Sequence, residues 1–291
     1  DDQELLIQRT VREFLAAESA TSLVREVELS AHKYSPELWR RFAELGWSAL
    51  SLPEPVGGQG LDISYLGLVC EEVGRHLAPL PLHATLTCAS VLAGLGEAQH
   101  TALLEAVVSG DVLLSFAIQE QSGAWWPRGM DTRARATPDG FVLNGTKFFV
   151  DGAQTADKLL VAALLEETQP GGPTLAMFLV DARAEGIDVQ PLVPTAKDAQ
   201  AVVTFREVKL GGEALVGGKN SAAVLSSLMD LASILTVCMM EGAARKMMEV
   251  AVAYVNERQA FGQPIGAVQS IQHMAADMVK AVVGVPLVPR G

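Results

Sequence analysis

The sequence YVNERQAFGQPIGAVQSIQHMAADM, residues Tyr254–Met278, decides the fold more than any other stretch of this chain. A helical pattern of apolar residues extends from Ser221 to Arg258, and a second one extends from Ala267 to Val282. The stretch RQAFGQPIG between them contains two glycines and a proline, which are helix breakers. We therefore expect two long helices joined by a tight turn.

Upstream of this stretch, the first ~110 residues also carry helix signals. Ile7, Val11, Phe14 and Leu15 form one apolar stripe of an amphipathic helix. The pair Ser35-Pro36 is typical of a helix start, with a capping hydroxyl and proline in the first turn. Asp62 is a similar cap, and the Pro- and Gly-rich stretch before it predicts a loop.

Between these helical parts the pattern changes to short apolar runs separated by turn signals. Four runs have strand length: VLLSFAI (112–118), GFVLNGTKFFV (140–150), KLLVAAL (158–164) and TLAMFLV (174–180). The pair Asn144-Gly145 stands between two apolar runs and predicts a hairpin turn. This region is expected to form a β domain inserted into a helical protein.

The order of the patterns predicts an α+β fold in three parts. An N-terminal helical domain covers residues 1–110, a central β domain covers 111–215, and C-terminal helices cover 216–284. Residues 285–291 resemble an appended protease-recognition tail. Two long helices leave an apolar face that other helices must cover, so we expect the C-terminal bundle to be incomplete in this chain.

Composition excludes several classes of function. Hydrophobic residues make up 49% of the 291 residues and charged residues 19%, which favours a globular protein. The formal net charge of −12 argues against nucleic acid as a partner. Charges or glycines interrupt the apolar runs before the ~20 residues of a spanning helix, so we expect no membrane span. Three scattered cysteines and five separate histidines predict a cytoplasmic protein without a metal site.

With these residues in view, the segment Tyr254–Met278 closely resembles the signature of the acyl-CoA dehydrogenase family. Two other segments are similar to family motifs: PEPVGGQG (53–60) to an N-terminal loop, and NGTKFFVDGA (144–153) to a central hairpin. The resemblance implies α,β-dehydrogenation of an acyl-CoA thioester, with FAD as hydride acceptor and an electron-transfer protein as partner. In the family a carboxylate removes the α proton.

The resemblance also assigns cofactor roles in the C-terminal segment. Arg258 is expected to bind the pyrophosphate of an FAD held by a neighbouring subunit. Phe261 is expected to lie against the same cofactor, and Gln269 to offer it an amide. The alternatives are a cation that complements the helix end for Arg258 and core packing for Phe261.

In the β domain the family presents a strand ending in T-E-P-x-A-G-S-D, and this chain has IQEQSGAWW (118–126) there. Gln119 replaces the hydroxyl residue and is expected to bond the isoalloxazine edge. Trp125 is expected to occupy substrate space. Phe149 aligns with a flavin-stacking tryptophan, and Asp151 aligns with a threonine whose hydroxyl touches the flavin.

The catalytic base of the family stands in one of two places, and no base is identified here. The first place follows an apolar-Asp-apolar step, where this chain has Ala232 after Met229-Asp230-Leu231; the second lies in later helices. Glu241 is the nearest carboxylate on the same helix, but nine residues at ~100° each put it on the opposite face. A helix–helix contact is its alternative role. Asp230 is expected to touch CoA or to be solvated.

Three functional hypotheses follow. The first is an FAD-dependent acyl-CoA dehydrogenase, and the second is a non-catalytic partner subunit that supplies structure and part of an FAD site. The third is a related flavin oxidase. One apolar stripe of the first long helix consists of Leu225, Leu228, Leu231 and Leu235, and the other side carries Ile234, Val237 and Met240. We therefore expect a homo- or hetero-oligomer built through these helices.

Overall fold

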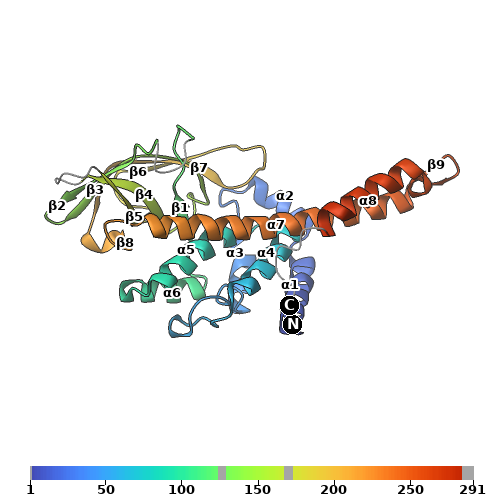
Figure 1. Cartoon of the computed structure of the whole chain (residues 1–291), viewed down its shortest axis with the longest axis horizontal. Helices are drawn as coiled ribbons and strands as arrows, with labels where there is room; N and C mark the ends of the chain where they lie inside the picture. Colours follow the sequence, from blue (N-terminus) through green and yellow to red (C-terminus); the bar gives the residue numbers. More distant parts are fainter. Residues whose placement is uncertain (1, 124–128, 167–172, 284–291) are drawn as a thin grey trace. The chain divides into compact units, whose positions relative to one another are not determined.

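Helices, then strands, then two long helices follow one another along the chain, in the order that the sequence predicts (Figure 1). The computed structural model describes residues 2–123, 129–166 and 173–283. These residues form two compact units. We call Asp1–Val24, Asp62–Ala78 and Ser233–Gly291 the helical unit, and Arg25–Leu61 with Pro79–Ala232 the sheet unit.

The N-terminal helices begin and end where the sequence signals indicate. Ser35 caps its helix by accepting a hydrogen bond from the Leu38 N–H (3.2 Å), and Asp62 accepts one from the Ser64 N–H (2.9 Å). The helices are α1 (Asp2–Glu18), α2 (Thr21–Leu29), α3 (Pro36–Glu44), α4 (Ile63–His76), α5 (Leu82–Leu95) and α6 (Thr101–Val108). Short 3-10 turns lie at Glu54–Val56 and Ala98–His100.

The central strands form a single sheet in the order β6-β7-β3-β2-β4-β5-β8, with β1 paired to β4. The strands are β1 (Leu114–Ala117), β2 (Arg133–Thr137), β3 (Gly140–Asp151), β4 (Lys158–Glu166), β5 (Thr174–Asp181), β6 (Ile187–Pro191), β7 (Gln200–Leu210) and β8 (Leu215–Val216). A 3-10 turn, Gly212–Ala214, precedes β8. Fully buried residues such as Leu143, Phe178 and Phe205 form its core.

The predicted hairpin at Asn144-Gly145 is wrong. These residues lie inside β3, where a register shift separates Leu143 from Gly145. The hairpin turn is instead Pro138-Asp139, between β2 and β3, where Thr137 pairs with Gly140. Gly145 is required for a different reason, because a Cβ there would lie 2.4 Å from the Thr132 hydroxyl oxygen.

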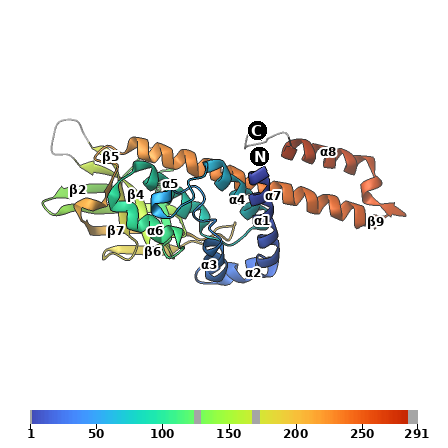
Figure 2. The same cartoon turned by 90° about the horizontal axis from the view of Figure 1, so that it is seen from below.

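The two long C-terminal helices are α7 (Ala222–Glu257) and α8 (Gln269–Val283). Strands β9 (Gln259–Ala260) and β10 (Gln263–Pro264) and a 3-10 turn, Ile265–Ala267, connect them. Figure 2 shows α8 turning back along the end of α7. Within the helical unit α7 crosses α4 closely, since a Cβ on Gly242 would lie 1.8 Å from the Glu71 carbonyl oxygen.

By length and composition α7 is also apolar enough to cross a membrane, and 33% of its most apolar window is buried in the protein. The sequence-based expectation of no such helix considered only unbroken apolar runs. Helix α7 does not meet that criterion because single charged residues interrupt it, but its 18-residue window is still apolar on average. The core helix of a globular protein has the same composition, so α7 is weak evidence for a membrane span.

Candidate functional site

The turn between α7 and α8 carries the residues assigned to the cofactor in the C-terminal segment. Ala260 and Gln263 pair across a two-residue turn, Phe261-Gly262, and both turn residues have positive φ (54° and 79°). Such a turn suits the twist of a two-residue hairpin, in which glycine or asparagine is usual. A phenylalanine here is strained, and the residue is 97% exposed.

Arg258 lies directly after the last residue of α7, and Gln269 is the first residue of α8. Both are exposed. Within residues 2–123, 129–166 and 173–283, the Arg258 guanidinium has neither an ion pair nor a side-chain hydrogen bond. The segment thus exposes a cation, an aromatic ring and an amide to solvent. This combination of groups suits a ligand that is both anionic and aromatic.

A second group of assigned residues lies in the sheet unit, where the end of β3 approaches β1. The Phe148 N–H donates to the Gln119 carbonyl oxygen (2.9 Å), and the Ser115 hydroxyl donates to the Asp151 carbonyl oxygen. Gln119 and Asp151 are half-buried, whereas Phe149, which has a φ of 55°, is 61% exposed. The structure therefore brings Gln119, Phe149 and Asp151 together at one end of β3.

The Asp151 carboxyl is chemically unlike the hydroxyl that it replaces. Burial raises its pKa to about 6, while the nearby His83 lowers and Asp198 raises that pKa. When ionised, Asp151 only accepts hydrogen bonds, whereas a threonine hydroxyl also donates. A ligand edge at this position consequently meets a group whose donor capacity depends on pH.

The expected base position on α7 is occupied by a buried methyl group. Ala232 is 7% exposed, and its carbonyl oxygen accepts a hydrogen bond from His83 Nε2 (3.0 Å), which fixes that nitrogen as the donor. His83 comes from α5, and its ring lies 6.1 Å from that of Phe116. Asp230 is exposed on α7. Sequence reasoning set His83 aside because nothing local connects it to a residue 149 positions later.

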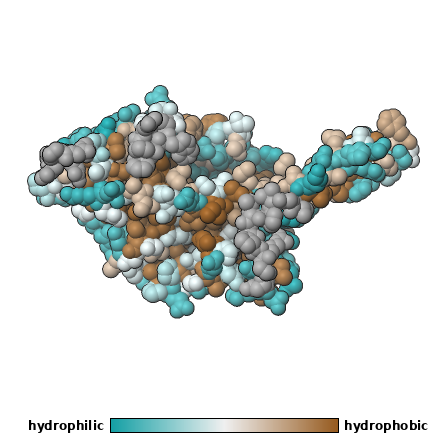
Figure 3. All heavy atoms as spheres, viewed as in Figure 1, coloured by the Kyte–Doolittle hydropathy of each residue, from teal (hydrophilic) through white to brown (hydrophobic). Residues whose placement is uncertain are grey.

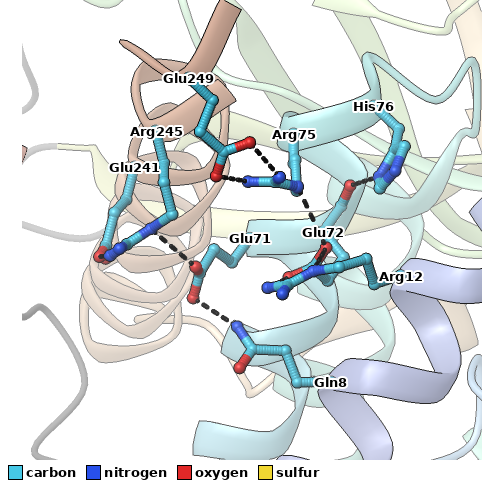
Figure 4. A network of polar contacts seen from close by, with 9 residues as sticks. All are labelled: Gln8, Arg12, Glu71, Glu72, Arg75, His76, Glu241, Arg245 and Glu249. Atoms are coloured by element: carbon cyan, nitrogen blue, oxygen red, sulfur yellow. Dashed lines mark hydrogen bonds and ion pairs between the residues drawn. The ribbon is translucent and has the colours of Figure 1, made fainter. Parts of the chain in front are cut away.

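Glu241 belongs to a network of ion pairs in the helical unit (Figure 4). It accepts a hydrogen bond from Arg245 (2.8 Å), which also approaches Glu71 (3.5 Å). Arg12 pairs with the fully buried Glu72 (2.6 Å). These contacts join α1, α4 and α7 and account for a carboxylate at Glu241 without a catalytic role.

A buried pair that sequence reasoning passed over lies beside Gln119. Lys147 is completely buried, and its ammonium donates to Glu120 Oε1 (2.7 Å) and to the Ile118 carbonyl oxygen (3.1 Å). Burial raises the Glu120 pKa, but Lys147 and two backbone N–H groups outweigh it and hold that pKa below its ordinary value. A lysine inside an apolar strand is the signal that could have identified the pair.

Two further expectations concern Trp125 and metal binding. Trp125, predicted to occupy substrate space, lies outside the described residues. In the described part of the chain, no group of three or more His, Cys, Asp or Glu side chains could hold a metal ion.

Comparison with known proteins covers nearly the whole chain. Three family descriptions match in order: "Acyl-CoA dehydrogenase, N-terminal domain" over residues 1–111, "middle domain" over 115–208 and "C-terminal domain" over 222–285. Acyl-CoA dehydrogenase FadE12 of Mycobacterium tuberculosis is 29% identical over 251 residues, which cover 84% of this chain and 65% of FadE12. The chain thus spans slightly less than two thirds of that relative.

Two solved structures are similar over more than nine tenths of the chain. The "Tcur3481-Tcur3483 steroid ACAD G363A variant" has a TM-score of 0.85 and 32% identity. The match covers 95% of this chain and 73% of the chain in that structure. The ChsE4-ChsE5 complex from Mycobacterium tuberculosis has a TM-score of 0.87 and 25% identity, with coverages of 98% and 75%.

Proposed function

The chain belongs to the acyl-CoA dehydrogenase family of oxidoreductases, and from this membership we propose that it is a subunit of an FAD-dependent enzyme that introduces an α,β double bond into an acyl-CoA thioester. The observation that carries the proposal is the hairpin between α7 and α8. It offers an exposed guanidinium and an exposed phenylalanine with a strained backbone, on a segment that matches the family's C-terminal domain. The three cysteines of the chain are buried free thiols, and they support the expected cytoplasmic location.

The residues present fit FAD at both described groups. Arg258 would bind the pyrophosphate of an FAD held by a neighbouring subunit through two N–H donors, and Phe261 and Gln269 would contact that same dinucleotide. Gln119, Phe149 and Asp151 would surround the ring system of the FAD that this chain itself holds. When bound, FAD supplies the hydride acceptor of the reaction. Among the replaced residues of this group, Asp151 fits the flavin edge least well, because an ionised carboxylate offers no donor there.

This chain's own residues do not complete the reaction in the proposed scheme. Removal of the α proton needs a carboxylate within hydrogen-bond reach of the α carbon. The methyl group of Ala232 cannot accept a proton, and Glu241 is engaged by Arg245. We therefore propose that the base is supplied by another polypeptide segment. Asp230, exposed on the same helix, would contact the CoA moiety.

A heteromeric enzyme is the form of the proposal that we favour. Both similar solved structures carry two polypeptide names in their descriptions. An arrangement of this kind would let the present chain contribute Arg258 and Phe261 to a cofactor site while a partner contributes the base. An electron-transfer protein would then reoxidise the flavin, as the family resemblance implies.

Dye reduction tests this proposal. The purified chain, at saturating FAD, is expected to reduce no artificial acceptor with straight-chain, branched or sterol-derived acyl-CoA thioesters. Addition of a candidate partner subunit that carries a carboxylate base is expected to give turnover. Turnover by the chain alone that disappears in Glu241→Gln would show that the base was assigned to the wrong face of α7.

A further inference from the structure

The end of β3 departs from regular strand geometry at the residue expected to contact the flavin. Between Lys147 and Val150 the pairing of β3 with β7 shifts register, so that Phe148 and Phe149 lie opposite a single residue of β7. An extra residue of this kind is a β-bulge, which redirects side chains and is common near active sites. The bulge places Phe149 at φ 55° with its ring turned toward solvent.

A set of contacts fixes this bulge against the exit of β1. The Lys147 ammonium donates to the Ile118 carbonyl oxygen (3.1 Å) and to Glu120 Oε1 (2.7 Å). The next residue, Phe148, donates its N–H to the Gln119 carbonyl oxygen (2.9 Å). Two consecutive residues of β3 are thereby bonded to three consecutive residues after β1. We call these five residues the β1–β3 clamp.

The ion pair inside the clamp is more elaborate than packing requires. Glu120 is 7% exposed and also accepts hydrogen bonds from the Thr132 N–H (3.1 Å) and the Asp131 N–H. A buried ion pair is seldom more stable than two apolar side chains of the same size, because both charges lose their hydration. What the charged pair adds is a defined geometry, since each bond has one direction and one length.

We propose that the Lys147–Glu120 pair is a positioning device: it holds Phe148 against Gln119 and so forces Phe149 into the left-handed backbone conformation that presents its ring to the flavin. The backbone N–H before Phe149 is fixed by Gln119, and regular pairing resumes at Val150. Phe149 alone absorbs the extra residue. This inference rests on the proposed function for the identity of the ligand. The effect of the Lys147–Glu120 pair on the backbone of Phe149 does not depend on that function.

The backbone effect is tested on the chain without cofactor. Phe149→Gly and Phe149→Ala both remove the ring, but only glycine is unstrained at positive φ. The glycine variant is expected to have the higher midpoint of thermal unfolding in the wild-type background. In the Lys147→Met background that difference should disappear, because the clamp no longer imposes the conformation. The same difference in both backgrounds would overturn the proposal.

A second variant keeps the test valid if Lys147→Met does not fold. Glu120→Gln keeps an acceptor oxygen and removes the charge, so it perturbs the clamp less than Lys147→Met does. The glycine-over-alanine difference at Phe149 is expected to be smaller than in the wild type here as well. An undiminished difference would again count against the clamp.

The effect on the ligand is measured in the assembled flavoprotein. Lys147→Met is expected to weaken FAD binding about tenfold and to shift the flavin absorption band, since the ring is no longer held in place. The matched control is Arg12→Met, which breaks the ion pair between a half-exposed Arg12 and the buried Glu72 in the helical unit. It should lower thermal stability without changing flavin affinity or absorption. Equal effects of both variants on FAD would show a purely structural role for Lys147, whereas a wild-type complex without FAD would refute the proposed function and leave the cofactor-free result standing.

Discussion

At the scale of single residues, backbone conformation distinguishes two of the side chains assigned to the cofactor. Phe149 and Phe261 are among six non-glycine residues with positive φ in the described part of the chain. Conformations of this kind cost ~1–3 kcal/mol each and persist where the surrounding structure imposes them. Both rings are largely exposed, so burial within the chain does not offset that cost. Strain at an exposed aromatic residue is better explained by a ligand than by packing.

Arg258→Ala is expected to lower the affinity for FAD about ten- to hundredfold, because a charge-assisted pair to the pyrophosphate is lost. The measurement is retention of yellow colour on gel filtration of the assembled protein, with the helical circular-dichroism spectrum unchanged. Lys280→Ala removes another exposed cation, on α8, and serves as the control. Stoichiometric flavin in Arg258→Ala after dilution would disprove the assignment.

Asp151 is expected to make the stability of the chain depend on pH. Its pKa of about 6 in the folded chain lies above the ordinary value of 3.8, chiefly because of burial. The folded state then binds the proton more tightly than the unfolded state does. The contribution of protonated Asp151 to the free energy of unfolding is therefore complete below pH 3.8 and is lost as pH rises through 6. One pKa unit corresponds to ~1.4 kcal/mol, so ionisation costs the fold ~3 kcal/mol at neutral pH.

Urea unfolding of the wild type and of Asp151→Asn measures this cost. The variant should be more stable than the wild type near pH 7.5, and the difference should shrink near pH 4.5. Asp198→Asn, at an exposed neighbouring carboxylate, should change stability much less. Parallel curves for wild type and Asp151→Asn across this range would mean that the carboxyl is solvated in the folded state.

Sequence alone could assign some of these residues and not others. Arg258, Phe261 and Gln269 lie within 12 consecutive positions of a strong family motif, so their proximity needs no tertiary information. His83 and Ala232 are 149 positions apart, and only the packing of α5 against α7 connects them. Lys147 is unusual as a lysine inside an apolar strand, but the sequence does not show that its partner is Glu120, 27 positions away.

At the scale of elements, the crossing of α4 and α7 depends on glycine. Cβ atoms built on Gly74 and Gly242 would lie 2.0 Å and 1.8 Å from backbone carbonyl oxygens of the facing helix. Arg75 and Glu249 then form a two-point ion pair across the same crossing. Close approach of the helix backbones brings short side chains and charged groups within reach of one another.

Gly242→Ala is expected to destabilise the chain by ~3 kcal/mol, because the added methyl group must push the two helices apart. Gly94→Ala is the matched control, since Gly94 lies in α5 without positive φ, and an added methyl group there would have nothing within 4 Å. At that position the higher helix propensity of alanine should stabilise by ~0.5–1 kcal/mol. Denaturant midpoints distinguish the two, and equal effects would show that the α4–α7 crossing tolerates a side chain.

Helices were predicted better than strands from the sequence. Caps such as Ser35 and Asp62 act within three residues, so local sequence determines them. Strand β7 was not predicted, because its alternation of apolar and polar residues includes Arg206 and Lys209 and its partners, β3 and β6, are distant or weakly apolar. The Asn144-Gly145 hairpin failed for a similar reason: β3 continues through these residues because β2 and β7 both pair with it.

At the scale of the whole molecule, the helical unit exposes many apolar side chains. Those on α7 and α8 that are more than half exposed are Ile234, Met240, Met247, Val250, Tyr254 and Met274. Apolar and hydrophilic residues mix along the α7–α8 hairpin on the face shown in Figure 3. Exposed apolar surface of this extent is typical of protein–protein interfaces.

We expect the protein to assemble through these helices into a dimer or a larger oligomer, alone or with a different chain. Light scattering at micromolar concentration measures the mass. The double substitution Met247→Glu with Met274→Glu should shift the protein toward monomer, since it places charges in the apolar contact. Leu29→Glu, at an even more exposed apolar residue of the sheet unit, should not cause this shift. A wild-type chain that is a stable monomer would contradict the expectation.

The discontinuous helical unit has a consequence for how the chain is made. Arg75 of α4 and its partner Glu249 of α7 are 174 positions apart. A ribosome adding ~5–20 residues per second exposes α1 and α4 roughly ten to thirty seconds before α7 emerges. During that interval Arg75 and the face of α4 that packs on α7 lack their α7 contacts, while the sheet unit already has nearly all of its sequence. Nascent chains should therefore bind chaperones through α1 and α4 and be released only when translation has passed the second half of α7.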